Sequence, residues 1–175
     1  MNKLTWTSRC DKVIKILSKL SVVSIDNIKE YSSTGIRKIS DKTLMNLEAK
    51  GYIKSEKFII DEKTIRAYSL DKKGKIKAIN AGYNIYNSNS KSHDICLSQN
   101  VFKYARENGI SMDNYFSEKE LIEVNGNTSR TDGMFYNPKE DISICIEQTN
   151  INYSKLYKEK KQNYAKAIGA EYIEF

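Results

Sequence analysis

Two acidic residues in the C-terminal half of the chain are spaced so that they could carry out metal-dependent chemistry. Asp132 opens one expected strand, 132–136, and Glu147 lies at the end of the next one, 142–148. Carboxylates at the ends of adjacent strands can converge on one divalent cation, which activates a water molecule for phosphodiester cleavage. This pair is the first candidate for a catalytic site.

The residues that follow Glu147 weaken this hypothesis. The pair resembles the core of PD-(D/E)XK nucleases, whose third strand ends in Glu-x-Lys, whereas this chain has Thr149 at the lysine position. The charge that stabilises the transition state is therefore missing there, and only Lys155 or Lys158 in the next helix could replace it from another position. Because one fold hosts many functions, we favour a nuclease-like scaffold in which the two carboxylates are vestigial and no residue is catalytic.

A second set of residues, in the N-terminal half, is suited to binding DNA. Ser40 is a good N-cap, because its hydroxyl can accept a hydrogen bond from a backbone N–H in the first turn of a helix. Gly51 ends that helix, since a residue without Cβ easily adopts the left-handed conformation. Two expected strands, 52–59 and 64–70, follow with a polar turn between them. A helix, a glycine stop and a basic hairpin together resemble the recognition helix and wing of a winged helix-turn-helix domain.

The side chains expected to contact DNA belong to the helix, to the hairpin and to the segment before the helix. The polar outer face of the helix can reach base edges in the major groove, as Asn does with adenine and Lys with guanine. Basic side chains of the hairpin and of the upstream segment can meet phosphates. The full set is Arg37, Lys38, Ser40, Lys42, Thr43, Asn46, Lys50, Lys54, Lys57, Lys63 and Arg66. The alternative is an exposed lysine-rich face of a protein-interaction module.

Charge is unevenly distributed along the 175 residues of the chain. Residues 1–90 carry 18 Lys and Arg against 9 Asp and Glu, whereas residues 91–175 carry 11 against 13. The N-terminal half therefore accounts for the whole formal net charge of +7, which predicts contact with a polyanion there. A general lysine bias would explain the abundance of lysine but not this asymmetry.

Cysteine, histidine and hydropathy patterns argue against several other classes of protein. The cysteines at positions 10, 96 and 145 are odd in number and far apart, so we expect buried, reduced thiols. His93 is the only histidine, so a zinc site would need unusual ligands, and we expect neither a metal nor a cofactor. The sequence has no apolar run of membrane-spanning length and no signal-peptide pattern, so we expect a cytoplasmic protein that does not bind membranes.

We expect an α+β protein with two domains. The first, 1–82, is the winged helix-turn-helix domain, and 83–91 is a linker rich in Asn and Ser. The second, 92–175, is a small nuclease-like domain with the order αβββαβ. Its elements are expected as helix 92–107, strands 120–124, 132–136 and 142–148, helix 153–168 and strand 172–175.

Short motifs in both halves resemble those of the replication-relaxation family of plasmid, phage and conjugative-element proteins. In the first half they are L-M-N-L-E-A-K-G-Y-I and L-D-K-K-G-K. In the second half they are S-H-D-I-C-L, S-R-T-D-G-M-F-Y, I-C-I-E-Q-T and K-x-K-K-Q-N-Y. Where the family has Arg-Pro-Asp, this chain has Arg-Thr-Asp at 130–132. The resemblance implies a winged helix joined to a degenerate nuclease-like domain, and a role in mobile-element replication, relaxosome assembly or gene control.

The sequence therefore predicts a sequence-specific protein that binds double-stranded DNA as an accessory or regulator in replication, relaxosome assembly or transcription on a plasmid or other mobile element. The alternative is a metal-dependent DNA endonuclease of the PD-(D/E)XK type that its winged helix targets. A third hypothesis is an anchor whose C-terminal domain forms a homodimer or recruits a relaxase or replication protein.

Overall fold

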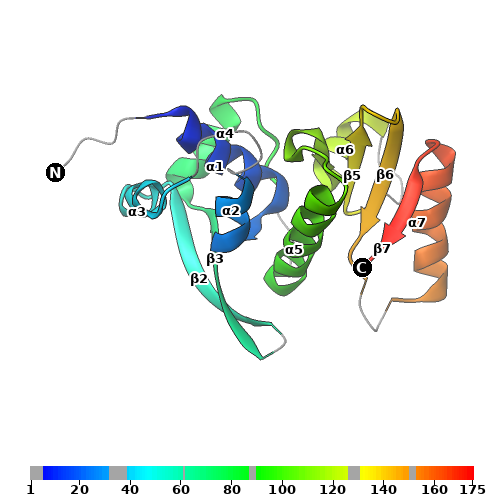
Figure 1. Ribbon diagram of the computed structural model, residues 1–175, viewed down its shortest axis with the longest axis horizontal. Helices are drawn as coiled ribbons and strands as arrows, with labels where there is room; N and C mark the ends of the chain where they lie inside the picture. Colours follow the sequence, from blue (N-terminus) through cyan, green and yellow to red (C-terminus); the bar gives the residue numbers. More distant parts are fainter. Residues whose placement is uncertain (1–5, 32–38, 61, 87–89, 126–130, 150–152) are drawn as a thin grey trace. The chain divides into compact units, whose positions relative to one another are not determined.

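The computed structural model of the protein describes residues 6–31, 39–60, 62–86, 90–125, 131–149 and 153–175 (Figure 1). These residues form a mixed α+β structure with two sheets, which confirms the expected class. The chain divides into two compact units, Met1–Gln99 and Asn100–Phe175. The division falls inside α5 (Lys91–Glu107), so the first part of this helix belongs to unit 1 and the rest to unit 2.

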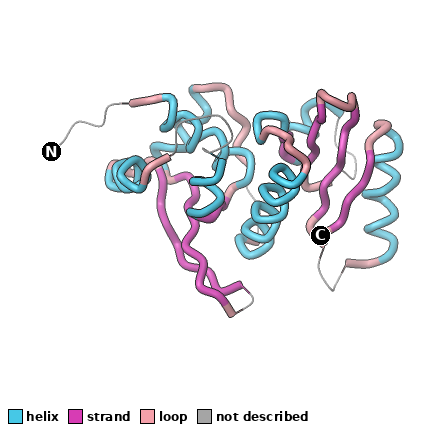
Figure 2. The backbone as a smooth tube through the Cα atoms, viewed as in Figure 1, coloured by secondary structure: helices cyan, strands magenta, loops and turns pink. Residues whose placement is uncertain are grey.

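Unit 1 is built on a three-stranded antiparallel sheet with the order β1-β3-β2. β2 (Ile53–Ile60) and β3 (Lys63–Leu70) pair along their whole length as a long hairpin, which Figure 2 shows in magenta. β1 (Val22–Ser24) pairs with the end of β3, and the sequence did not predict it because three residues are too few to show alternation. The helices are α1 (Ser8–Leu20), α2 (Ile25–Tyr31), α3 (Asp41–Ala49) and α4 (Lys72–Asn80).

The core of unit 1 forms where the apolar stripe of α1 meets α3, α4 and β3. Residues of this stripe recur at helical spacing and are fully buried, namely Val13, Ile16, Leu17 and Leu20. Leu44 and Leu47 of α3, three residues apart on one helical face, are buried as well. Each such side chain stabilises the fold by about 1.5–3 kcal/mol. The buried side of α3 is therefore fixed, and this determines which side of the helix faces solvent.

Glycines and capping side chains fix the ends of α3 and α4. The Ser40 hydroxyl accepts from the Thr43 N–H at 3.3 Å, and Gly51 after α3 has φ +73°, both as expected. Asp71 accepts from the Lys72 N–H at 2.8 Å, where α4 begins. A Cβ at Gly74 would lie 1.9 Å from the Tyr52 carbonyl oxygen, so only glycine lets α4 pack this closely against the chain before β2.

The start of α5 covers one face of the sheet of unit 1. Ile95 is buried in a cluster with Val22 and Ala67, which lie on the same face because strand side chains alternate. The expected linker, 83–91, has packed residues at both ends: the Tyr86 N–H donates to the Ser18 carbonyl at 2.8 Å, and Lys91 pairs with Glu56. Residues 87–89 lie outside the described residues, so a linker there stays a prediction.

Unit 2 contains a four-stranded sheet with the order β4-β5-β6-β7. β4 (Tyr115–Ser117), β5 (Gly133–Asn137) and β6 (Ile142–Glu147) are antiparallel neighbours, and β7 (Glu171–Glu174) runs parallel to β6. The parallel pair needs a crossover, which α7 (Lys155–Ala167) provides. A short 3-10 helix, η1 (Met112–Asn114), precedes β4, and α6 (Glu118–Asn125) follows it.

The expected strand 120–124 is wrong, because these residues belong to α6. Ser117 and Glu120 form a capping box: the Ser117 N–H and hydroxyl donate to Glu120 Oε2 at 2.8 and 2.9 Å, and the Glu120 N–H approaches the Ser117 hydroxyl at 3.4 Å. This reciprocal cap starts a helix, and the strand that pairs with β5 lies before it. The observed order from α5 onward is thus α-β-α-β-β-α-β rather than αβββαβ, if η1 is set aside.

Helices cover the two faces of the sheet of unit 2. Cys145 on β6 is buried with Tyr164 and Ala165 of α7. On the other face, Tyr104 of α5 lies against Phe135, with 5.8 Å between the ring centroids. The three cysteines of the chain are free thiols; Cys10 and Cys145 are buried, as expected, whereas Cys96 is only half-buried. None of the helices in the described residues has the length and apolarity that crossing a membrane requires.

Candidate nucleic-acid interface and a buried acidic cluster

The outer face of α3 is the first candidate site. Lys42, Met45, Asn46 and Ala49 are exposed and follow the spacing i, i+3, i+4, i+7, so they lie in one stripe. The stripe is mixed in character, with a charge, an amide and two apolar groups. Such a stripe can read both the polar edges of bases and the methyl group of thymine.

This stripe differs in part from the face predicted from the sequence. Thr43 and Lys50 are half-buried, and the hydroxyls of Ser40 and Thr43 lie 3.1 Å apart at the start of the helix. Both hydroxyls are thus used in capping. Met45, whose surface is 63% exposed, takes a central place that the sequence analysis missed. Because Met45 directly follows buried Leu44, its side chain points away from the buried side of the helix. The helical periodicity of the sequence could have predicted this exposure.

Glu48 connects α3 to the hairpin. One carboxylate oxygen accepts from the Ser55 N–H at 3.0 Å and from the Ser55 hydroxyl at 2.5 Å. The other accepts from the Arg66 guanidinium at 3.2 Å. Arg66 also donates to the Ser55 hydroxyl at 3.2 Å. Arg66 was predicted to contact phosphate, but here it holds the helix against β2 and β3.

The two faces of the hairpin divide the remaining basic residues. Lys57 lies opposite Arg66 in the register, so both project on the face that Glu48 of α3 contacts. Lys54 projects on the other face, where its ammonium pairs with Glu56 at 3.2 Å. Lys54 is therefore directed away from the outer face of α3. Lys63 starts β3 next to the turn and is exposed.

Four of the predicted basic residues keep their charge available. Among the described residues, no acidic side chain pairs with Lys42, Lys50, Lys57 or Lys63. Arg37 and Lys38 lie outside the described residues, so their contact with phosphate stays a prediction. The exposed stripe of α3 and the Lys57 side of the hairpin together form the α3–hairpin surface, the name used from here on.

The second candidate site is buried in unit 2. Asp132 and Glu147 are 7% and 0% exposed, and they lie side by side because Gly133 pairs with Ile146. Glu147 Oε2 accepts from the Asp132 N–H at 3.1 Å, and Asp132 Oδ2 accepts from the Gln148 N–H at 2.8 Å. The structure thus brings together the two carboxylates that the sequence singled out.

A cation completes this cluster, but it is neither of the expected lysines. The Lys161 ammonium of α7 is 3.3 Å from Glu147 Oε1, and the Tyr153 hydroxyl donates to the same oxygen at 2.6 Å. Lys158 instead pairs with Glu174 at 2.8 Å, and Lys155 lies on the exposed side of the helix. Lys161 lies in a run of charged residues, 158–161, but it shares a helical face with buried Tyr164 and Ala165.

Burial dominates the electrostatics of this buried cluster. Burial and then the nearby charge of Asp132 raise the pKa of Glu147 to about 7, while Lys161 and Tyr153 act in the opposite direction. Burial alone would lower the pKa of Lys161, but the charges of Glu147 and Asp132 outweigh it and raise that pKa. The charged forms of Glu147 and Lys161 therefore stabilise each other.

The buried cluster satisfies its own polar groups. The carboxylates of Asp132 and Glu147 accept hydrogen bonds from the Tyr153 hydroxyl and from the backbone N–H groups of Gln148 and Asp132. Within the described residues, no group of three or more His, Cys, Asp or Glu side chains is placed to hold a metal ion. Both carboxylates of the cluster thus have hydrogen-bond partners within the protein.

Comparisons with protein-family models, with curated proteins and with solved structures gave no match to this chain. The assignment of function therefore depends on the residues of the α3–hairpin surface and of the buried cluster. The two sites differ in the property that matters most for ligand binding, which is access to solvent.

Proposed function

We propose that the protein binds double-stranded DNA in a sequence-specific manner, with unit 1 acting as a winged helix-turn-helix domain. The observation that carries this proposal is the α3–hairpin surface, in which an exposed stripe of α3 is joined to the hairpin through Glu48. A helix about 10–12 Å in diameter fits a major groove about 12 Å wide. The lysines around the stripe, which pair with no acidic side chain of the described residues, supply the positive charge that a phosphate backbone attracts.

The residues of this surface have separate tasks in the proposed complex. Lys42 and Asn46 hydrogen-bond to base edges, and Met45 packs against a thymine methyl group. Lys57 and Lys63 contact phosphates, which position the protein without reading sequence. Glu48 holds the helix and hairpin in one orientation, so that little conformational entropy is lost when DNA binds.

The biological setting is also a proposal. The motif resemblance supports an accessory or regulatory role in replication, relaxosome assembly or transcription on a mobile element. Unit 2 then acts as a nuclease-like scaffold without catalysis, available for a homodimer contact or for a relaxase or replication protein. Its self-satisfied buried cluster supports this assignment.

Binding is tested with the full chain. Fragments of plasmid or genomic DNA that the protein retains are sequenced, and the recovered site is titrated by fluorescence anisotropy at several salt concentrations. Lys57→Gln should weaken binding to all sequences and reduce the slope of log K against log salt by about 1. Lys103→Gln is the matched control, because Lys103 is an exposed lysine of unit 2.

Specificity is tested at Asn46. Asn46→Ala should reduce the preference for the recovered site over a scrambled duplex by about 1–3 kcal/mol, because a base-specific hydrogen-bond pair is lost. The salt slope should stay unchanged, since Asn46 carries no charge. Full affinity and specificity in both Asn46→Ala and Lys42→Glu would exclude α3 as the recognition helix.

One observation favours a second candidate, a metal-dependent DNA endonuclease. Lys161 brings a positive charge to Asp132 and Glu147, which replaces the charge that Thr149 cannot supply. A divalent ion would have to displace protein donors from the carboxylates, and Asp132 is the more accessible of the two. When bound, such an ion would activate water, and Lys161 would lie beside the charge that develops on the phosphate.

We expect no cleavage of supercoiled plasmid with Mg²⁺ or Mn²⁺ at stoichiometric protein, because the carboxylates are buried and already hydrogen-bonded. The measurement is gel analysis of nicked and linear products. Divalent-dependent nicking that disappears in Asp132→Ala and in Glu147→Ala, with DNA affinity retained, would establish the endonuclease instead. In that case Lys161→Met should lower the rate by roughly 100- to 1000-fold.

A further inference from the structure

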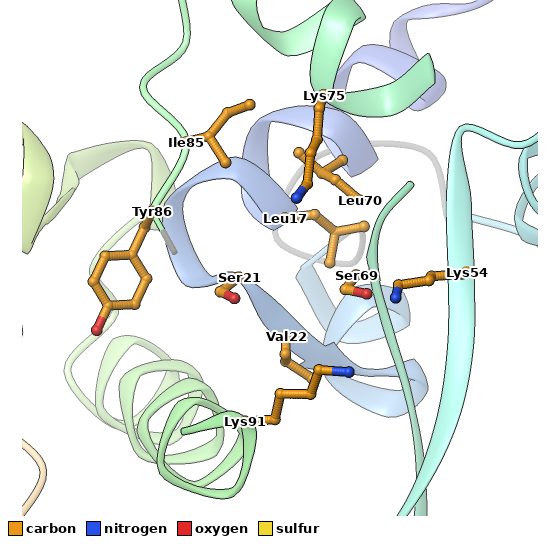
Figure 3. A pocket seen from close by; sticks show the side chains of 10 residues that line it. All are labelled: Leu17, Ser21, Val22, Lys54, Ser69, Leu70, Lys75, Ile85, Tyr86 and Lys91. Atoms are coloured by element: carbon orange, nitrogen blue, oxygen red, sulfur yellow. The ribbon is translucent and has the colours of Figure 1, made fainter. Parts of the chain in front are cut away.

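Unit 1 contains a cavity at the base of the hairpin, between α1, α4 and the start of α5 (Figure 3). Its volume is about 140 Å³. Buried apolar side chains, Leu17, Val22 and Leu70, form part of its wall, and three lysines, Lys54, Lys75 and Lys91, surround it. Lys54 faces away from the outer side of α3, so this cavity is separate from the α3–hairpin surface.

The charge around the cavity is positive. No acidic side chain lines it among the described residues. Lys54 and Lys91 both pair with Glu56, at 3.2 and 2.5 Å, and with no other acidic side chain of the described residues. Lys75 pairs with no acidic side chain in the described part of the chain. Three cations therefore face one anion, and an anionic ligand would be attracted to the remaining positive charge.

The size and the wall of the cavity restrict the ligand further. A cavity of about 150 Å³ with apolar walls can hold a molecule as large as benzene. An inorganic anion would leave the apolar wall in contact with water, whereas a neutral ring would leave the lysines without a partner. The combination suits a molecule that has both an apolar body and a negative charge.

The backbone at Ser21 supports a ligand site. Ser21 lines the cavity and has φ 61° and ψ −57°, a region that residues other than glycine rarely adopt. Such strained residues cost about 1–3 kcal/mol each and are concentrated at ligand-binding sites. This backbone conformation turns the chain from α1 into β1. Ser21 and Val22 therefore both border the cavity (Figure 3).

We propose that this cavity binds a small organic anion, with an apolar body of about the size of a benzene ring and one carboxylate or phosphate group. The apolar body lies against Leu17 and Val22. The anionic group lies between the ammonium groups of Lys75 and Lys54, and it competes with Glu56 for Lys54 and Lys91.

The test is isothermal titration calorimetry of the full chain at constant ionic strength with four probes. Benzoate and phenyl phosphate carry both features, benzyl alcohol carries only the ring, and inorganic phosphate carries only the charge. We expect benzoate, phenyl phosphate or both to bind at least tenfold more tightly than the two comparators, since benzyl alcohol lacks the charge-assisted hydrogen bond and inorganic phosphate lacks the apolar contact. Equal binding of benzyl alcohol and benzoate, or no heat from either anion at millimolar concentration, would overturn the proposal.

Variants locate the site. Lys75→Gln should weaken binding of the better probe about tenfold. Lys73→Gln is the control, because Lys73 belongs to the same helix and does not line the cavity. Glu56→Gln should strengthen binding, because it releases Lys54 and Lys91 from their shared partner. Equal losses in Lys75→Gln and Lys73→Gln would show nonspecific attraction to a basic protein and would overturn the site, as would amide NMR shifts that spare Ser21 and Ser69.

Discussion

On the outer face of α3, Lys42 is exposed and pairs with no acidic side chain in the described residues, whereas Lys161 of α7 is buried and lies 3.3 Å from Glu147. The Lys42 ammonium is hydrated, so its charge costs little free energy and is accessible to a polyanion. The Lys161 ammonium has lost most of its hydration and is stable only with its partner. An unpaired surface charge is thus available to a ligand, whereas a paired buried charge is bound up with the stability of the fold.

The largest effect should come from removing the buried cation. Lys161→Met leaves the Glu147 carboxylate buried without its ion pair, which should lower the free energy of unfolding of unit 2 by about 3–5 kcal/mol at pH 8. The measurement is urea denaturation followed by circular dichroism. DNA affinity should persist under native conditions, because the α3–hairpin surface lies in unit 1.

Lys160→Met is the matched control for this experiment. Lys160 is the exposed neighbour of Lys161 in α7, and its replacement should change stability by less than about 0.5 kcal/mol. Equal stability of the two variants would mean that Lys161 contributes no more than a surface lysine. The contrast between the two charged regions would then not hold.

The next effect concerns pH and depends on Glu147. Its pKa is raised from 4.5 to about 7, so between these values the folded state binds more protons than the unfolded chain. The free energy of unfolding should therefore fall as pH rises through this window, by about 3 kcal/mol in total. Below the window the carboxyl is protonated in both states and this part of the stability is fully present.

Glu147→Gln should remove most of this pH dependence, which urea denaturation at pH 5 and at pH 8 can measure. Lys161→Met should enlarge it, because the pKa of Glu147 rises further without the nearby cation. A wild-type protein whose stability is constant from pH 5 to pH 8 would show that the Glu147 carboxylate is well compensated. The contribution of the buried cluster to the free energy of unfolding would then not change with pH, and the contrast with the exposed surface would be lost.

Local signals in the sequence predicted much of the fold and one half of the buried cluster. Ser40 and Gly51 mark helix ends through their own chemistry, so α3 was placed almost to the residue. Asp132 and Glu147 come together because adjacent antiparallel strands place their ends side by side. Both kinds of signal act between near neighbours, or across one hairpin.

Other features could not be predicted because they depend on tertiary partners or on competing local patterns. Lys161 looks like part of a solvated run until the phase of α7 against the sheet is known. The β-branched residues Ile122 and Val124 of α6 suggest a strand, but the Ser117–Glu120 capping box takes precedence. Glu48 and Arg66 come from elements that only the packed hairpin brings together.

The smallest effect tests whether the α3–hairpin surface depends on an internal acid for its shape. Glu48→Gln removes a negative charge from a surface that should bind a polyanion, so electrostatics alone predicts slightly tighter DNA binding. If Glu48 instead orients α3 through Ser55 and Arg66, the same change should weaken binding by a few-fold, because the helix and hairpin lose their fixed relation. The expected loss of stability is also small, about 0.5–1 kcal/mol, since the pair is partly exposed.

Glu62→Gln separates these two effects. Glu62 is an exposed acid at the hairpin turn, so its replacement changes the charge by the same amount without touching the Glu48 contacts. Anisotropy titrations should show tighter binding for Glu62→Gln and weaker binding for Glu48→Gln at the same salt concentration. Tighter binding in both variants would mean that Glu48 acts only through its charge. The orientation of α3 would then be set by the buried Leu44 and Leu47 alone.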